Sequence, residues 1–194
     1  MSPSSNYLID SDVLITVKNR YYAFPVCPGF WESVLHGHSR GHLHSIDRVR
    51  QELLKGREDD DLVRWVRQSV PPNFFLPGDG GEVVAACREV ISWVTHHPQY
   101  QDEAKAKFAG GADGWLIAHG VITGRTVATN EQPRPESRSV IKMPDVCHRF
   151  NVQSNLKTPF PCCIRSVSST ITRASLQQCQ PTPSAPLKPQ SNAA

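Results

Sequence analysis

The nine residues Tyr7-Leu-Ile-Asp-Ser-Asp-Val-Leu-Ile15 contain the pattern that decides the fold. The apolar run 7–9 is typical of a short buried strand, and Asp10 follows it directly. Asp12 comes two residues later, and the apolar run 13–15 predicts that a helix begins there. A buried carboxylate is costly without a partner, so an Asp at the end of a buried strand is a candidate for a functional site. In an Asp-x-Asp pair at a strand end, both carboxylates can point toward one metal ion.

Three further acidic residues follow similar local patterns. Glu52 lies in a predicted helix after the short strand 43–46, and Asp113 opens the apolar helix 112–122 after two glycines. Glu131 comes just after the predicted strand 126–129. Ligands of open α/β sheets bind where the strands end, so these acids are expected to meet at one edge. Such a cluster would repel itself unless a divalent cation bound there, which predicts a metal-dependent hydrolase of phosphodiesters, with a nuclease as the first choice.

Short apolar strands alternate with helical patterns along residues 7–150. Strands are predicted at 7–9, 43–46, 126–129 and 140–142, and the helix 82–96 has the most regular apolar spacing. Pro144 predicts the start of a last helix that reaches about residue 150. The alternation predicts an α/β fold, with a central and mainly parallel sheet of four to five short strands flanked by helices.

Charge is unevenly distributed over the 194 residues. All 18 acidic residues, but only 16 of the 21 Lys and Arg residues, lie within 1–145, so the net charge of +3 comes from the basic end of the chain. A broad electrostatic field for nucleic acid is therefore not predicted for the folded part. Contacts with RNA would depend on local clusters such as Arg48, Arg50, Lys55 and Arg57.

The composition changes after about residue 152. Residues 153–194 are rich in Pro, Ser and Thr and contain no acid, which predicts a largely disordered basic tail behind a folded domain over 6–152. No Cys forms a CxxC pair, and Cys27, Cys87 and Cys147 lie in apolar helical contexts where a free thiol is usual, so a reducing cytoplasm is expected. No run is long enough and apolar enough to span a membrane, and the N-terminus lacks the pattern of a signal peptide.

Taken together, the four acidic segments resemble the motifs of PIN domains. Residues 7–15 resemble the opening strand of these domains, and residues 45–53 resemble their second motif, which carries an acid on a helix. Residues 112–118 and 127–131 are similar to the third and fourth motifs. The stretches 18–22, 28–31 and 142–147 resemble one PIN-like group, the DUF4411 family. The resemblance covers residues 6–152 and is specific as a set.

The resemblance implies a three-layer PIN-like fold and a Mg²⁺- or Mn²⁺-dependent endoribonuclease, similar to VapC-type toxins of toxin–antitoxin pairs. Asp10 and Asp113 correspond to direct metal ligands, and Glu52 and Glu131 to direct or water-mediated ones. Thr129 corresponds to a hydroxyl residue that orients water or phosphate. Asp12 corresponds to an Asn or Asp of the first motif and is included among the metal-binding residues. The expected partners are an RNA substrate, a small DNA-binding antitoxin and a second copy in a homodimer.

The chain departs from the PIN pattern in two places. Glu131 is a longer acid than the commoner Asp, and the usual final strand and helix are not recognisable after Val152. These departures leave open a PIN-like domain that binds RNA or a partner without cutting. A second alternative is a haloacid-dehalogenase-like phosphatase, whose opening Asp-x-Asp has a nucleophilic first Asp, although Val13 and Leu14 replace its usual Gly-Thr. Each acid also has a purely structural interpretation, as a helix cap or a solvated carboxylate.

Overall fold

The computed structural model describes residues 6–155 and contains a parallel five-stranded sheet in the order β3-β2-β1-β4-β5. The strands are β1 (Tyr7–Ile9), β2 (Leu43–Ile46), β3 (Phe75–Leu76), β4 (Thr126–Ala128) and β5 (Ser154–Asn155). The helices are α1 (Ser11–Thr16), α2 (Pro28–Ser39), α3 (Asp47–Leu53), α4 (Asp61–Gln68), α5 (Gly81–His96), α6 (Asp102–Gly110), α7 (Asp113–Thr123) and α8 (Met143–Arg149). A π-helical turn (Val17–Tyr21) extends α1, and a 3₁₀ turn (Pro72–Phe74) precedes β3.

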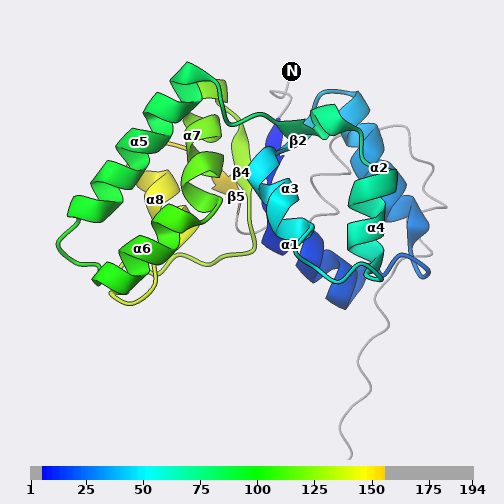
Figure 1. Ribbon diagram of the computed structural model, residues 1–194, viewed down its shortest axis with the longest axis horizontal. Coiled ribbons are helices and arrows are strands. Elements are labelled where there is room, and N and C mark those ends of the chain that lie inside the picture. The colour runs from blue at the N-terminus through cyan, green and yellow to red at the C-terminus, as the bar shows by residue number, and fades with distance from the viewer. Residues whose placement is uncertain (1–5, 156–194) are drawn as a thin grey trace, which may run out of the picture.

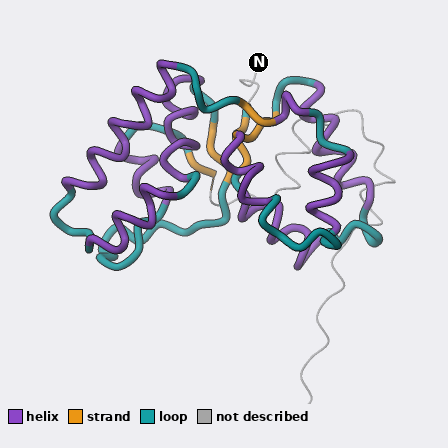
Figure 2. Tube along the Cα trace, viewed as in Figure 1, coloured by secondary structure: helices purple, strands orange, loops and turns teal. Residues whose placement is uncertain are grey.

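The helices lie in two groups with the sheet between them. Figure 1 shows α1 to α4, in blue to blue-green, on one side and α5 to α8, in green to yellow, on the other. The strands run between the two groups in Figure 2. The predicted α/β fold with a parallel sheet between helical layers is therefore confirmed.

The sheet is buried on both faces, as expected for parallel strands covered by helices. Leu8 and Ile9 of β1, the central strand, are fully buried, and Leu43 and Ile46 of β2 are equally inaccessible. The buried Ser45 of β2 donates a hydrogen bond of 2.7 Å to the Ile9 carbonyl and so needs no water. The apolar run before Asp10 is thus the centre of the core, which fixes where Asp10 emerges.

Some predictions about short elements were wrong. Residues 140–142 form no strand within the described part of the chain; they lead directly into α8, and the Val140 N–H bonds to Ser137 Oγ at 3.3 Å. Only Ile141 of this segment is buried, while Val140 remains 40% exposed. One side chain of the apolar pair therefore packs in the core, and the segment forms no ladder with a described strand. β3 was not predicted, because two residues are too few to show a periodicity.

The end of the sheet lies beyond the boundary that we predicted at Val152. β5 pairs in parallel with β4, and the Val127 N–H donates to the Gln153 carbonyl at 2.8 Å. A final strand that was not recognisable from the sequence is therefore present at Ser154–Asn155, within the segment predicted to be largely disordered, while the rest of the predicted tail, 156–194, lies outside the described residues.

Two smaller expectations from the sequence concern the cysteines and membrane-spanning helices. Cys87 and Cys147 are free and buried as expected, but Cys27 is disulfide-bonded. No helix in residues 6–155 combines the length and the apolar character that crossing a bilayer requires.

Gly120 of α7 provides a test of how tightly this end of the sheet is packed. A Cβ at position 120 would lie 2.6 Å from Val152 Cγ1, just before β5. We expect Gly120→Ala to lower the free energy of unfolding by about 1–2 kcal/mol, because overpacking outweighs the gain in helix propensity. Gly81→Ala, where a Cβ would meet nothing within 4 Å, is the matched control and should be neutral in the same denaturant titration. Equal stability of the two variants would contradict this packing.

Candidate carboxylate site

The parallel topology brings the ends of β1, β2 and β4 to one edge of the sheet. Asp10 follows β1, and the helix that carries Glu52 follows β2. Thr129 and Glu131 follow β4. Helix α7 precedes β4 and returns the chain to the start of that strand, so its first residue, Asp113, lies at the same edge as the other acids.

Asp10 is the most buried of these acids, with 5% of its surface exposed. It is the N-cap of α1, and its carboxylate accepts a hydrogen bond of 2.6 Å from the Ser11 N–H. Thr129 Oγ1 donates to its other oxygen at 3.4 Å. Burial raises the pKa of Asp10 well above its ordinary value, and the charges of Asp12 and Asp113 raise it further. Asp10 thus caps the helix in addition to lying at the candidate site.

Asp113 lies close to three other acidic side chains. Burial raises its pKa from 3.8 to about 7, and the charges of Glu131, Glu52 and Asp12 add to the effect, while Lys142 opposes it. Among the described residues, no group donates a hydrogen bond to the Asp113 carboxylate. An acid at a helix start without a donor, and with three negative neighbours, is the least satisfied group at this edge.

Glu52 links two of the segments that form the site. Its Oε2 accepts a hydrogen bond of 2.9 Å from Ser11 Oγ, and its Oε1 accepts one of 3.3 Å from the Ala112 N–H. Glu52 therefore connects the end of β1 to the start of α7, directly beside Asp113. Ser11 was not predicted as a site residue, and only its position between two acids could have indicated it.

Asp12 is held against the end of β4. Its carboxylate accepts a hydrogen bond of 3.1 Å from the Asn130 N–H, and the Asn130 side chain donates to its carbonyl at 3.3 Å. Burial raises the pKa of Asp12, while hydrogen bonds with the Asp10 side chain and the Asn130 N–H oppose the rise. Asp12 therefore fixes the loop that carries Thr129 and Glu131, and its role as a metal ligand stays a prediction.

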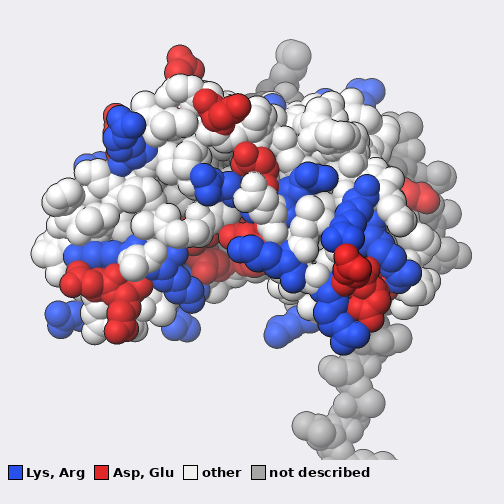
Figure 3. All heavy atoms as spheres, in the orientation of Figure 1, with Lys and Arg blue, Asp and Glu red and all other residues white. Residues whose placement is uncertain are grey.

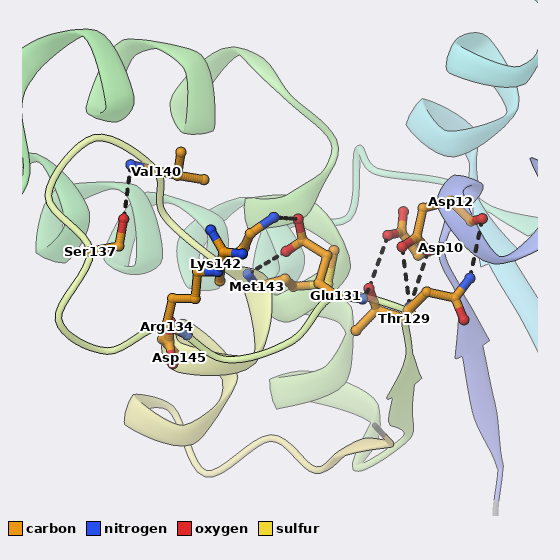
Figure 4. Close-up of polar contacts among 11 residues, drawn as sticks. Asp10, Asp12, Thr129, Glu131, Arg134, Ser137, Val140, Lys142, Met143 and Asp145 are labelled. Carbon is orange, nitrogen blue, oxygen red and sulfur yellow. Dashed lines mark hydrogen bonds and ion pairs between the residues drawn. The ribbon is translucent and has the colours of Figure 1, made fainter. Parts of the chain in front are cut away.

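Glu131 is turned away from the other acids. Figure 4 shows its carboxylate directed toward Lys142 and Met143 rather than toward Asp10 and Asp12. Lys142 Nζ lies 2.8 Å from its Oε1, and the Met143 N–H donates to its Oε2 at 2.8 Å. Glu131 is close enough for its charge to affect Asp113, but it is ion-paired with a residue that was not predicted as part of the site.

Cys147 of α8 lies against the same cluster. This thiol is fully buried, and burial, followed by the charges of Asp113, Asp10 and Glu131, raises its pKa to about 12. The Cys147 thiol is therefore protonated at neutral pH and lines the site as an uncharged group. Lys142, Met143 and Cys147 all come from the stretch 142–147, which was recognised as a family-like motif but was given no role.

The donor set fits a hard divalent cation. All the candidate ligands are carboxylate oxygens, and the pKa values of Asp10, Asp12 and Asp113 are raised partly by neighbouring acids, which a cation would counteract. No three His, Cys, Asp or Glu side chains of residues 6–155 are already arranged to share one ion. The carboxylates would therefore have to draw together around it.

The molecular surface shows where such a site would open. In Figure 3, acidic atoms lie recessed in a hollow between the two helical halves, with Lys and Arg side chains along the borders of the hollow on this face. A negative centre bordered by positive groups is suited to a cation below and an anionic chain above it.

The structure thus combines a parallel sheet between two helical layers with acids that follow the carboxyl ends of its strands. The chain belongs to the family described as "Domain of unknown function (DUF4411)", whose model matches residues 7–158. No curated protein matches the chain. Among solved structures, it is similar to that of FitAB bound to an IR36 DNA fragment, with 19% identity and a TM-score of 0.48 over 77% of this chain and 94% of that chain.

Proposed function

We propose that this protein is a divalent-metal-dependent endoribonuclease of the PIN type. The observation that carries the proposal is the convergence of buried and half-buried acids from separate elements at one sheet edge, where burial and neighbouring negative charges raise the pKa values of Asp10, Asp12 and Asp113. Such a cluster lowers the stability of the folded chain when no cation is bound. Its presence therefore indicates a function that needs it. Phosphodiester hydrolysis assisted by Mg²⁺ or Mn²⁺ is one chemistry that uses clustered carboxylates of this kind.

The roles of the residues follow from their contacts. Asp10 and Asp113 would hold the ion directly, while Asp12, Glu52 and Glu131 would bind it directly or through water. When bound, the ion supplies a water of lowered pKa and offsets charge on the phosphate. Thr129 donates to Asp10 and accepts from the Glu131 N–H at 3.1 Å, so its hydroxyl positions the two acids and can orient water or phosphate.

The test is cleavage of a mixed pool of tRNA and mRNA by the purified chain. We expect cutting with Mg²⁺ or Mn²⁺ and none after a chelator removes the ion, with activity restored by readdition. Cleavage that continues at full rate in excess chelator would refute the proposal, because the acids would then have no ion to hold.

A second candidate is a domain that binds RNA or a partner without cutting. The observation that favours it is the ion pair of Glu131 with Lys142, together with the lack of a ready-made three-residue metal site in the described part of the chain. The two functions are separated by one comparison. A binding domain would retain RNA at every metal concentration while the RNA stays intact.

The resemblance to PIN toxins also supports proposals about the biological setting. We infer a cytoplasmic toxin that forms a complex with a small DNA-binding antitoxin, and a homodimer as the form of the toxin. Expression in a bacterial host should slow growth, and Asp10→Asn should relieve the effect. Co-purification with the product of a neighbouring small gene would identify the antitoxin, whereas harmless expression of an active nuclease would contradict a toxin role.

Thr129→Val should lower kcat for RNA cleavage by roughly tenfold, since a hydrogen bond that holds a catalytic carboxylate is lost at a buried site. Thr129 is only 4% exposed, and Val has nearly the same shape, so the fold should be retained. Thr129→Ser keeps the hydroxyl and is the matched control. Equal kcat values for the Val and Ser variants would show that the hydroxyl has no such role.

A further inference from the structure

A cavity of about 390 Å³ lies between α5, α6 and α7. It is lined by Val84, Cys87, Arg88, Ile91, Ser92, Ala109 and Trp115. Most of these side chains are apolar, and the exposed residues Arg88 and Ser92 stand at its border. The volume is at the lower end of the range for small-molecule sites, roughly 300–1,000 Å³, so one flat ring system is an occupant of suitable size.

Trp115 connects this cavity to the carboxylate site. It lies two residues after Asp113 on α7, and the guanidinium carbon of Arg48 is 4.2 Å from the centre of its ring. Arg48 stands one turn before Glu52 on α3, so the two share one face of that helix. Glu52 in turn accepts from the Ala112 N–H. Glu52, Arg48, Trp115 and the cavity therefore form one continuous path away from the acids.

The path is positively charged beyond Glu52. Arg48 and Arg88 are both exposed, and within residues 6–155 neither forms a salt bridge. The charge of Arg48 reaches into the cavity, because it partly offsets the rise that burial produces in the pKa of Cys87. An occupant with an anionic backbone and a flat apolar substituent would match both the unpaired cations and the apolar lining.

We propose that the cavity binds an unpaired nucleobase of single-stranded RNA, while a neighbouring phosphate of the same strand lies at the carboxylate site. The proposal rests on the proposed nuclease function and names the form of its substrate. Unpaired bases are recognised by stacking on aromatic rings and on the planes of Arg side chains, and Trp115 under Arg48 offers both. Arg88 is placed to contact the sugar-phosphate chain at the cavity border.

The test uses a Trp substitution at the border of the cavity to fill it. RNA binding is then measured in a chain that cannot cut the RNA. The full chain carries Asp10→Asn, so that a labelled, unstructured short RNA stays intact during fluorescence anisotropy. Ala109→Trp blocks the cavity from an exposed position on α6. Ala85→Trp places the same side chain on an exposed position of α5 outside the cavity lining and is the matched control.

We expect Ala109→Trp to weaken binding of the single-stranded RNA by roughly tenfold, within the range that loss of one stacked base produces. Ala85→Trp should change the affinity by less than about twofold. The affinity for the same RNA as a duplex should not respond to Ala109→Trp, because paired bases cannot enter the cavity. If Ala109→Trp unfolds the chain, Ser92→Trp fills the cavity from α5 and should weaken binding in the same way.

Three results would overturn the proposal. The first is equal RNA affinity in the filled and control variants; if the wild-type chain still cuts RNA, only the base site fails and the nuclease function stands. The second is a change of oligomeric state in Ala109→Trp with unchanged RNA affinity, which would make the cavity a contact between copies of the chain. The third is the absence of any RNA binding, and the metal-dependent cleavage assay then decides separately on the nuclease.

Discussion

Asp10→Asn and Asp113→Asn should each lower metal-dependent RNA cleavage by roughly a thousandfold, equivalent to about 4 kcal/mol of transition-state stabilisation. An amide keeps the shape of each side chain but removes the negative charge that would hold the ion. Asp10 is buried at the end of the central strand, and Asp113 has no hydrogen-bond donor among the described residues, so a cation is the partner that each charge would gain.

The measurement is the rate of RNA cutting at saturating Mn²⁺ and Mg²⁺, with circular dichroism to show that each variant is folded. Asp79→Asn is the matched control, because Asp79 is an exposed acid just beyond β3, and this change should leave the rate within about twofold. If the two site variants cut as fast as the control, the carboxylate cluster is not the catalytic centre.

Without divalent ions, the protein should lose stability as the pH rises from about 4 to about 7. The pKa of Asp113 is raised from 3.8 to about 7 in the folded chain, so between these values the folded state binds more protons than the unfolded state. Stability therefore falls with increasing pH over this window. The expected loss from this one group is about 2–4 kcal/mol, or roughly 5–10 °C in Tm, and Asp10 shifts in the same direction.

Thermal unfolding at pH 5 and pH 8, in chelator, measures this effect. Asp113→Asn cannot acquire the charge and should show a much smaller difference between the two pH values. Added Mg²⁺ should raise the Tm of the wild-type chain at pH 8 more than at pH 5, because the ion binds the deprotonated acids. A wild-type chain that is more stable at pH 8 than at pH 5 in chelator would contradict the raised pKa values of Asp113 and Asp10 in the folded chain.

The centre of the fold could be predicted from sequence because its signals are local. The apolar run 7–9 followed by Asp10 identified β1 and its position in the core, and the strands before Glu52 and Glu131 were found in the same way. Parallel topology then places the acids at one edge without further information. β3 and β5 were missed because strands of two residues leave no pattern, and their existence depends on neighbours already in the sheet.

The detailed geometry of the site could not be predicted because it depends on partners distant in sequence. Glu131 is turned by Lys142 and by the Met143 backbone, and no spacing rule connects an acid with a cation eleven residues later across an irregular loop. The link from Glu52 to Ser11 joins residues 41 positions apart, and it exists only after α3 packs beside α1. The segment 140–142 has strand composition, but it pairs with no strand of the described sheet and leads into α8.

The central position of β1 has a consequence for synthesis. Of the five described strands, β1 leaves the ribosome first, yet it pairs with β4, and the site also needs residues up to Glu131. At about 5–20 residues per second, Asp10 waits roughly 6–24 s before the last acid of the cluster has been made. During that interval the growing chain has no complete carboxylate cluster. A ribonuclease with this topology would be unable to cut its own message until nearly the whole described domain had been translated.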